Sequence, residues 1–166
     1  MNINEIIQKI IPPDDYQNRY DFDNRSIIDS LSYEEQKQVE ELLIKLLMTK
    51  SDLLIVETLS YLKSEKSLPI FYSLLNSDCN EWAKIIISAS IYSIKKDNMM
   101  IDVAINAFKK FEQNQDNYFK FTVLPMFYYL ARFRNERIND ILEKYSKDSD
   151  YLIAYNANKA LNNSTS

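Results

Sequence analysis

The sequence contains neither glycine nor histidine among its 166 residues, and it has a single cysteine. Glycine makes up roughly 7% of an average protein, so its absence implies that no backbone position requires the positive φ that glycine alone adopts at low cost. Phosphate-cradling loops and two-residue hairpins are therefore disfavoured. Without an imidazole, the chain has no ordinary general base near neutral pH and no common zinc ligand. We therefore expect a non-catalytic protein without a metal or a cofactor.

Other absences bear on where the protein works. Cys79 cannot form an internal disulfide, which is typical of a reducing compartment. The segment MNINEIIQKIIPPDD lacks the basic flank and the apolar run of a signal peptide. No segment approaches the ~20 apolar residues of a membrane helix. We expect a soluble, cytoplasmic protein that does not contact a membrane.

The net charge of −4 is unevenly placed along the chain. Residues 1–50 hold 10 acidic and 6 basic side chains, whereas residues 51–166 hold 14 of each. Nucleic-acid-binding proteins usually carry a basic stripe that releases counterions from phosphates, and this chain has none. The charge pattern argues against a nucleic-acid partner and gives the N-terminal part an acidic character.

Apolar residues recur at helical spacing through most of the sequence, which predicts an all-α fold. A first helix is expected over 3–11, because Pro12 and Pro13 would stop it, and a short helical turn over 26–31. Ser32 and Glu35 have the spacing of a capping box and predict the start of a longer helix. Residues 1–50 thus form an irregular acidic N-terminal cap.

The rest of the chain repeats a plan of two helices joined by a polar break. The copies span 51–78, 80–112 and 116–148, and a half-copy at 149–162 would form a C-terminal capping helix. Apolar positions of the first two copies correspond at a displacement of 32 residues. A period of 30 to 50 residues indicates stacked helix pairs, because one pair cannot bury its apolar face alone. In the third copy, Pro125 is expected to kink or split the long helix.

The stretch YLKSEKSLPIFYSLL (61–75) resembles a HEAT repeat, with a helix, a short polar turn and an L-P start of the second helix. The glycine that usually precedes the turn is missing, as is the usual arginine. This resemblance implies a short right-handed α-solenoid of HEAT-like antiparallel helix hairpins, forming a single domain over 1–166.

Carboxylates and aromatic rings alternate in the loop after the first helix. A calcium-binding reading fails, because an EF-hand needs Gly at its sixth position and Arg25 lies where a ligand would be. The loop is then either a solvated acidic segment or a partner-binding surface, since buried rings beside steering charges suit an interface. Packing of Tyr20 and Phe22 onto the first helices is a third reading. The residues concerned are Asp14, Asp15, Tyr16, Tyr20, Asp21, Phe22 and Asp23.

A second candidate surface follows from the HEAT resemblance, which implies that the second helix of each pair lines a concave face. Its polar residues are Tyr72, Asn76, Asp102, Asn106, Asn139 and Glu143.

The third copy also contains more aromatic residues than one helix face can bury. These rings either fill the core or form an exposed tyrosine patch for a partner. They are Tyr118, Phe119, Phe121, Phe127, Tyr128, Tyr129 and Phe133.

Cys79 precedes a predicted helix, where the helix dipole favours a thiolate. No histidine is present to activate it, so an inert thiol is the simpler reading.

These features favour a binding protein over an enzyme. The chain resembles small bacterial HEAT-like proteins, some of which are immunity proteins, and this implies neutralisation of a cognate toxin such as a basic toxin domain. The main alternative is a scaffold or adaptor that holds a peptide or helix in its concave groove. A HEAT-like nucleic-acid-processing module is a second alternative, which the neutral body disfavours. We assume a monomer.

Overall fold

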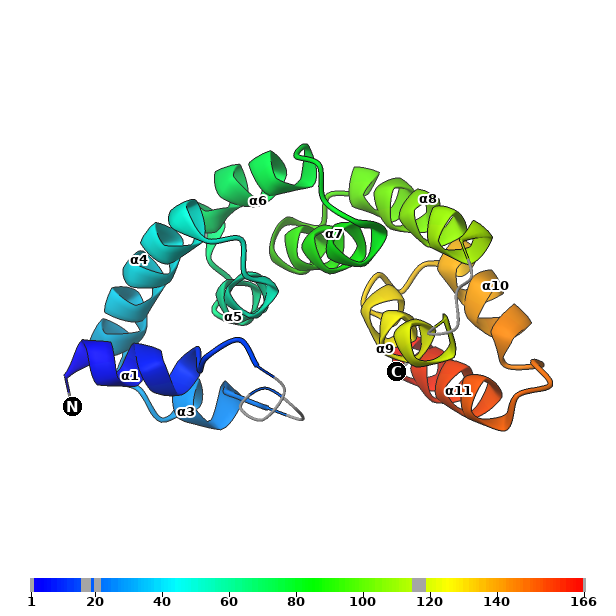
Figure 1. Cartoon of the computed structure of the whole chain (residues 1–166), viewed down its shortest axis with the longest axis horizontal. Helices are drawn as coiled ribbons and strands as arrows, with labels where there is room; N and C mark the ends of the chain where they lie inside the picture. The colour runs from blue at the N-terminus through cyan, green and yellow to red at the C-terminus, as the bar shows by residue number, and fades with distance from the viewer. Residues whose placement is uncertain (1, 16–18, 20–21, 115–118, 166) are drawn as a thin grey trace. The chain divides into compact units, whose positions relative to one another are not determined.

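The computed structural model describes residues 2–15, 19, 22–114 and 119–165 (Figure 1). These residues form ten α-helices and one turn of 3₁₀ helix, and none of them lies in a strand. The prediction of an all-α fold is confirmed. The contacts between residues divide the chain into two compact units, Met1–Leu74 and Leu75–Ser166.

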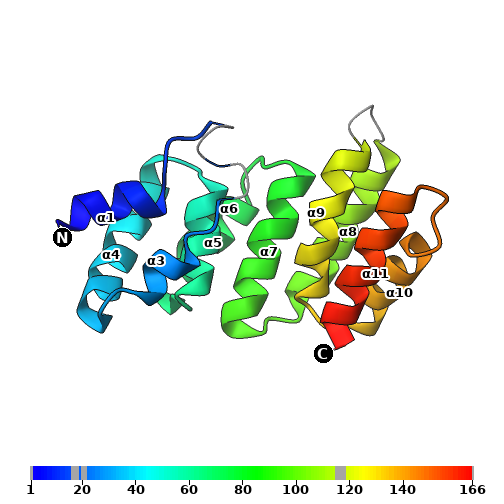
Figure 2. The same ribbon diagram turned by 90° about the horizontal axis from the view of Figure 1, so that it is seen from below.

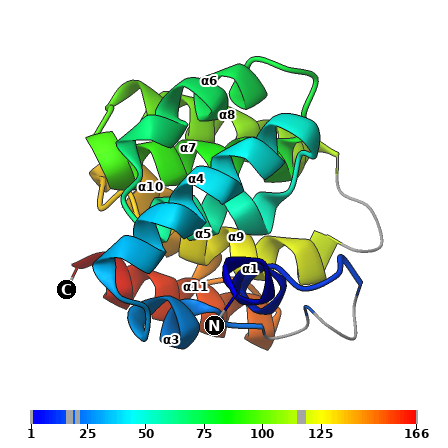
Figure 3. The same cartoon turned by 90° about the vertical axis from the view of Figure 1, so that its left-hand side faces the viewer.

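The first unit is built around α4, which begins at the predicted capping box. The backbone N–H of Glu35 donates to Ser32 Oγ (3.4 Å), and the backbone N–H of Ser32 donates to the Glu35 carboxylate (2.9 Å). One face of α4 is buried and packs against α1 and α5. Figure 3 shows α1 end-on beside α3, with α4 crossing above both. The helices of this unit are α1 (Ile3–Ile10), α3 (Arg25–Asp29), α4 (Tyr33–Thr49), α5 (Leu53–Tyr61), the 3₁₀ turn Glu65–Ser67 and α6 (Leu68–Leu75), at whose end the unit boundary falls.

The second unit contains two layers of helices. α7 and α8 pack against each other as a hairpin, and α9 contacts α7, α10 and α11. Figure 2 shows α7, α9 and α11 side by side, with α8 and α10 behind them. The helices are α7 (Glu81–Lys95), α8 (Met99–Gln113), α9 (Phe119–Ala131), α10 (Glu136–Tyr145) and α11 (Tyr151–Thr165).

Aromatic side chains fill the core between these two layers. The buried ring of Phe108 contacts the rings of Phe127 and Tyr145, with centroids 6.4 and 5.7 Å apart. Phe133 is also fully buried. Pro125 lies inside α9 without dividing it, so the expected split of the long helix does not occur.

Among the residues that the structure describes, three have a positive φ, of 55° at Lys63, 58° at Lys96 and 46° at Arg134. Each follows the first helix of a hairpin. At Lys63, the backbone N–H groups of Lys63 and Ser64 donate to the carbonyls of Ser60 and Leu59, which is the Schellman pattern of a helix C-terminus. The expectation that a glycine-free chain needs no positive φ is wrong, because capping hydrogen bonds offset the steric cost of a Cβ.

Several side-chain contacts within each unit link residues separated by 32 to 35 positions, while others, such as Tyr128–Asn156 and Asn139–Ser164, span 28 and 25. In the first unit the former join Asp29 to Tyr61, Thr58 to Asn24, and Asp52 to Arg19. In the second, they join Arg137 to Asp102 (2.7 Å) and both Lys144 and Tyr145 to Glu112 (2.6 and 2.7 Å). The spacing is close to the displacement of 32 residues found in the sequence.

Candidate functional site

The segment between α1 and α3 is held by one arginine. Arg19 donates to both carboxylate oxygens of Asp52, at 2.8 Å each, and to the carbonyl of Pro12 through Nε and NH2, at 3.1 and 2.9 Å. Only 17% of the Arg19 side chain and 2% of the Asp52 side chain are exposed. A bidentate pair of this kind is geometrically specific. It ties the segment to the start of α5.

Asp52 has a second role as the N-cap of α5, where it accepts a hydrogen bond from the backbone N–H of Leu54 (3.0 Å). Burial by itself would raise the pKa of this carboxyl, but the hydrogen bond and charge of Arg19, together with the Leu54 N–H and the charge of Lys50, outweigh burial and lower the pKa. The same hydrogen bond raises the pKa of Arg19. Asp52 is therefore ionised at neutral pH, as the pair requires.

The C-terminal end of the segment is held by a buried amide. Asn24 Nδ2 donates to the carbonyl of Ile10 (3.1 Å) and to Thr58 Oγ1 (2.8 Å). Arg19 and Asn24 thus attach the segment to α1 and α5 at two points.

A pocket of about 470 Å³ lies in the first unit beside this segment. The end of α1, the C-terminal end of α4 and the start of α5 form its walls, and most of the lining is apolar. The apolar residues are Ile11, Pro12, Pro13, Leu46 and Ile55; the polar ones are Gln8, Arg19, Lys50 and Asp52.

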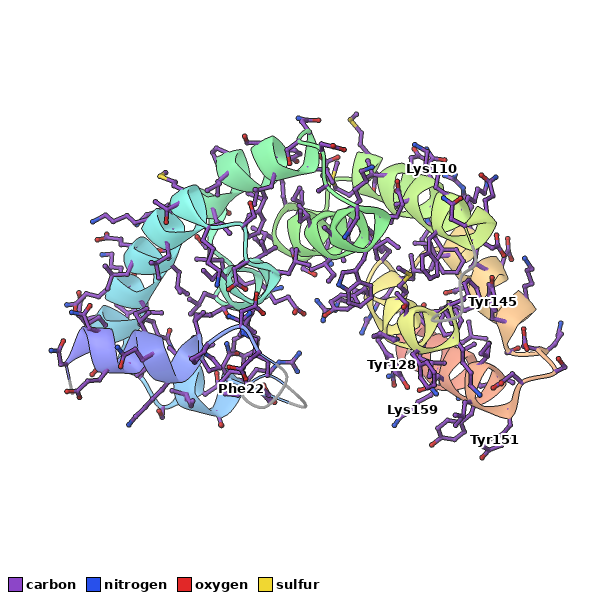
Figure 4. The ribbon with its side chains drawn as sticks, viewed as in Figure 1. Phe22, Lys110, Tyr128, Tyr145, Tyr151 and Lys159 are labelled. Carbon is purple, nitrogen blue, oxygen red and sulfur yellow. The ribbon has the colours of Figure 1, made fainter. Side chains whose placement is uncertain are left out.

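The carboxylates predicted to face a partner are exposed wherever the structure describes them. Asp14 is 66% exposed and lies 3.4 Å from Arg19, and Asp15 is exposed. Asp23 is 68% exposed and lies 3.8 Å from Arg25. Phe22, labelled in Figure 4, is half-buried. Tyr16, Tyr20 and Asp21 lie outside the described residues.

The second predicted set lies on or next to three helices, α6, α8 and α10. Tyr72 is half-buried on α6, and Asn76 is exposed just after it. Asp102 on α8 pairs with Arg137, and Asn139 on α10 accepts a hydrogen bond from Ser164 Oγ (2.6 Å). The remaining members, Asn106 and Glu143, are exposed.

The predicted aromatic run divides between the core and the surface. Phe127 and Phe133 are buried, Phe119 stacks on Phe111 (5.2 Å), and Phe121 is 67% exposed. Tyr128 and Tyr129 are half-buried, and Tyr118 lies outside the described residues.

Sequence reasoning missed exposed rings on α11 beside this run. Tyr151 and Tyr155 are stacked with centroids 6.0 Å apart and are 75% and 50% exposed. Tyr128 OH donates to Asn156 Oδ1 (2.8 Å), which joins α9 to α11. Figure 4 shows Tyr128, Tyr151 and Lys159 on the side of these helices turned away from α8. Tyr151 and Tyr155 are four residues apart and so share one face of a helix, which is the sequence signal for this surface.

The thiol of Cys79 and the acidic side chains are further candidates for chemistry of their own. Cys79 is half-buried, and burial raises the pKa of its thiol, so the thiolate favoured by the helix dipole is not the dominant form at neutral pH. No group of three or more Cys, Asp or Glu side chains within the described part of the chain is placed to hold a metal ion. No helix in that part is long and apolar enough to cross a membrane.

Comparisons with protein-family models, with curated proteins and with solved structures find no match for this chain.

Proposed function

We propose that this chain is a stoichiometric protein-binding module, and specifically a bacterial immunity protein that neutralises a toxin with a basic surface in the cytoplasm. The observation that carries the proposal is the segment after α1, in which exposed Asp14 and Asp15 stand beside an apolar pocket. An apolar centre with a charged rim is the usual anatomy of a protein interface.

The charge of the first unit supports a basic partner. Residues 1–74 hold 13 acidic and 8 basic side chains, a net charge of −5, whereas residues 75–166 hold 11 and 12, a net charge of +1. A surface of one sign speeds encounter with a partner of the other sign. A basic nuclease or other basic toxin domain is the class of partner that this charge suits.

We also propose that the helix pairs form a right-handed HEAT-like solenoid. Two features support this arrangement: the left-handed residues at Lys63, Lys96 and Arg134, which end successive first helices, and the side-chain contacts between residues 32 to 35 positions apart. A stack of similar pairs would produce both at a regular interval.

The second candidate is an adaptor that holds a peptide or helix of several partners. The exposed rings of Phe121, Tyr151 and Tyr155 favour it, because tyrosine is enriched in binding surfaces. An adaptor would bind several proteins weakly, whereas an immunity protein would bind one tightly.

Co-expression with the product of the neighbouring gene tests the immunity proposal. We expect that product to arrest growth alone, and growth to recover when this chain is co-expressed. The double variant Asp14→Lys/Asp15→Lys should lose the protection, whereas Asp102→Lys on α8 should retain it. A harmless neighbour, or a toxic one that this chain does not relieve, contradicts the proposal.

A further inference from the structure

The pocket of the first unit has an apolar interior and a polar wall. Ile11, Pro12 and Pro13 follow α1, Leu46 lies on α4, and Ile55 lies on α5. Leu46 is 40% exposed, although it lies on the same helix as the buried Leu43 and Leu47. The cavity of about 470 Å³ is large enough for one aromatic or aliphatic side chain.

The charges in the wall are already paired with one another. Both NH groups of Arg19 that face Asp52 are hydrogen-bonded to it, and Lys50 Nζ lies 3.4 Å from the same carboxylate. Arg19 Nε and NH2 also donate to the Pro12 carbonyl, and NH1 lies 3.4 Å from Asp14 Oδ1. A charged ligand would have to compete with these contacts, so the pocket suits an uncharged group.

The rim of the pocket, unlike its wall, carries exposed negative charge. Asp14 is only 3.4 Å from the Arg19 guanidinium yet remains 66% exposed, and Asp15 is exposed next to it. Counting Asp14, Asp15 and Asp52 against Arg19 and Lys50, the site has a net charge of −1. A ligand that places an apolar group inside therefore gains if it carries positive charge just outside.

We propose that this pocket receives a large apolar side chain of a partner protein, and that basic residues on both sides of that side chain contact the exposed carboxylates at the rim. The inference rests on the proposed function for the source of the ligand, and it names the part of the partner that the site recognises. A single apolar side chain buried in a pocket is the type of contact that dominates many interfaces.

Short peptides test the inference without the partner. The probe is Ac-Lys-Phe-Lys-NH2, titrated into the ¹⁵N-labelled full chain and followed by NMR. We expect saturable shifts of the backbone amides of Gln8, Leu46 and Ile55, with a dissociation constant on the order of millimolar for so small a ligand. Ac-Lys-Ala-Lys-NH2 should bind at least about tenfold more weakly, and Ac-Glu-Phe-Glu-NH2 should also bind more weakly.

The peptide affinities test the apolar occupant and its basic flanks separately. Equal affinity of the phenylalanine and alanine peptides, or shifts that avoid the pocket, would overturn the apolar occupant. Equal affinity of the lysine and glutamate peptides would overturn the basic flanks.

Filling the pocket provides an independent test. Leu46→Trp places a ring in the cavity and should weaken binding of the lysine–phenylalanine peptide by about tenfold or more. Met48→Trp is the matched control, because Met48 lies on α4, is 69% exposed and does not line the pocket. Circular dichroism checks that both variants remain helical, and the comparison of peptides on the unmodified chain stands if Leu46→Trp does not fold.

The same variant separates this inference from the proposed function. If Leu46→Trp still protects cells as well as the unmodified chain and the peptides do not bind the pocket, the pocket inference fails and the immunity proposal stands. If the peptides bind as expected but the neighbouring gene product is harmless, the immunity proposal fails and the pocket remains a binding site.

Discussion

Arg19 and Asp52, 33 residues apart, form a bidentate ion pair in which the carboxylate is almost completely buried. The arginine belongs to the segment after α1, and the aspartate caps α5. This one pair therefore holds the acidic segment, one wall of the pocket and a helix N-terminus together.

Replacing Asp52 by Asn should lower the free energy of unfolding by about 3 kcal/mol, because a largely buried guanidinium then loses its buried carboxylate and keeps only the Pro12 carbonyl and the exposed Asp14. Asparagine is itself a good N-cap, so the loss reports on the ion pair and not on the cap. Urea denaturation measures it. Asp102→Asn is the control, since the Asp102–Arg137 pair is 61% and 59% exposed and its loss should cost less than about 1 kcal/mol. Equal losses in the two variants would contradict the role of the pair.

Acid should remove the contribution of Asp52. Its pKa is lowered in the folded state, so the unfolded chain takes up a proton first as pH falls. The stabilisation is complete above the ordinary aspartate pKa of about 3.9 and is lost as pH falls further. The difference in unfolding free energy between the unmodified chain and Asp52→Asn should therefore shrink below about pH 4. A difference that stays constant down to about pH 2 would show that Asp52 titrates normally.

Rules that depend on neighbouring residues in the sequence predicted the helices well. They did not predict contacts between segments that are distant in the sequence. The capping box at Ser32 and the helix stop at Pro12 depend on neighbours in sequence, and both are confirmed. The Arg19–Asp52 pair and the pocket depend on segments brought together by folding. The repeats found in the sequence begin at residue 51, so they did not predict a contact from Arg19. Arg25, which sequence reasoning weighed, flanks Asp23 and lies over the Tyr61 ring, whereas Arg19 links the segment to α5.

The missing glycines misled sequence reasoning for a different reason. A positive φ costs a non-glycine residue only about 1 kcal/mol. A chain can tolerate this cost if the backbone groups at the helix end are hydrogen-bonded. At Lys96, the backbone N–H donates to the Tyr92 carbonyl (2.9 Å), and Lys96 Nζ lies 4.7 Å from the centre of the Tyr92 ring. The absence of glycine therefore does not exclude a positive φ, whereas the absence of histidine does remove the imidazole group.

Arg134→Gly should stabilise the chain by about 0.5–1 kcal/mol, because glycine removes the steric cost of φ 46° at this position. Arg134 is exposed, so its side chain should contribute little. Arg134→Ala is the control, since alanine removes the same side chain but keeps the Cβ. Thermal unfolding of the three proteins measures the effect. A glycine variant no more stable than the alanine variant would argue against strain at this turn.

Association with the partner should depend on the exposed carboxylates. Changing Asp14, Asp15, Asp21 and Asp23 to Asn should slow association and reduce its dependence on salt, because rim charges act mainly on the encounter rate. Stopped-flow mixing with the neighbouring gene product, at low and high salt, measures both. Unchanged association kinetics would instead favour the surface that includes Asn106 and Glu143.

Alkaline pH should remove the stabilisation that Tyr145 contributes to the second unit. Tyr145 is 6% exposed and donates to Glu112 (2.7 Å), and burial together with this hydrogen bond raises the pKa of its hydroxyl. The stabilisation of a group with a raised pKa is complete below its ordinary value, about 10 for tyrosine, and is lost as pH rises beyond it. Tyr145→Phe should cost about 1 kcal/mol at neutral pH, and this difference should shrink above about pH 10, because ionisation then favours only the unfolded state of the unmodified chain. Urea denaturation of both proteins across this range measures it. A difference that grows with pH would mean that the folded protein accommodates the tyrosinate, and that Glu112 is held by Lys144 alone.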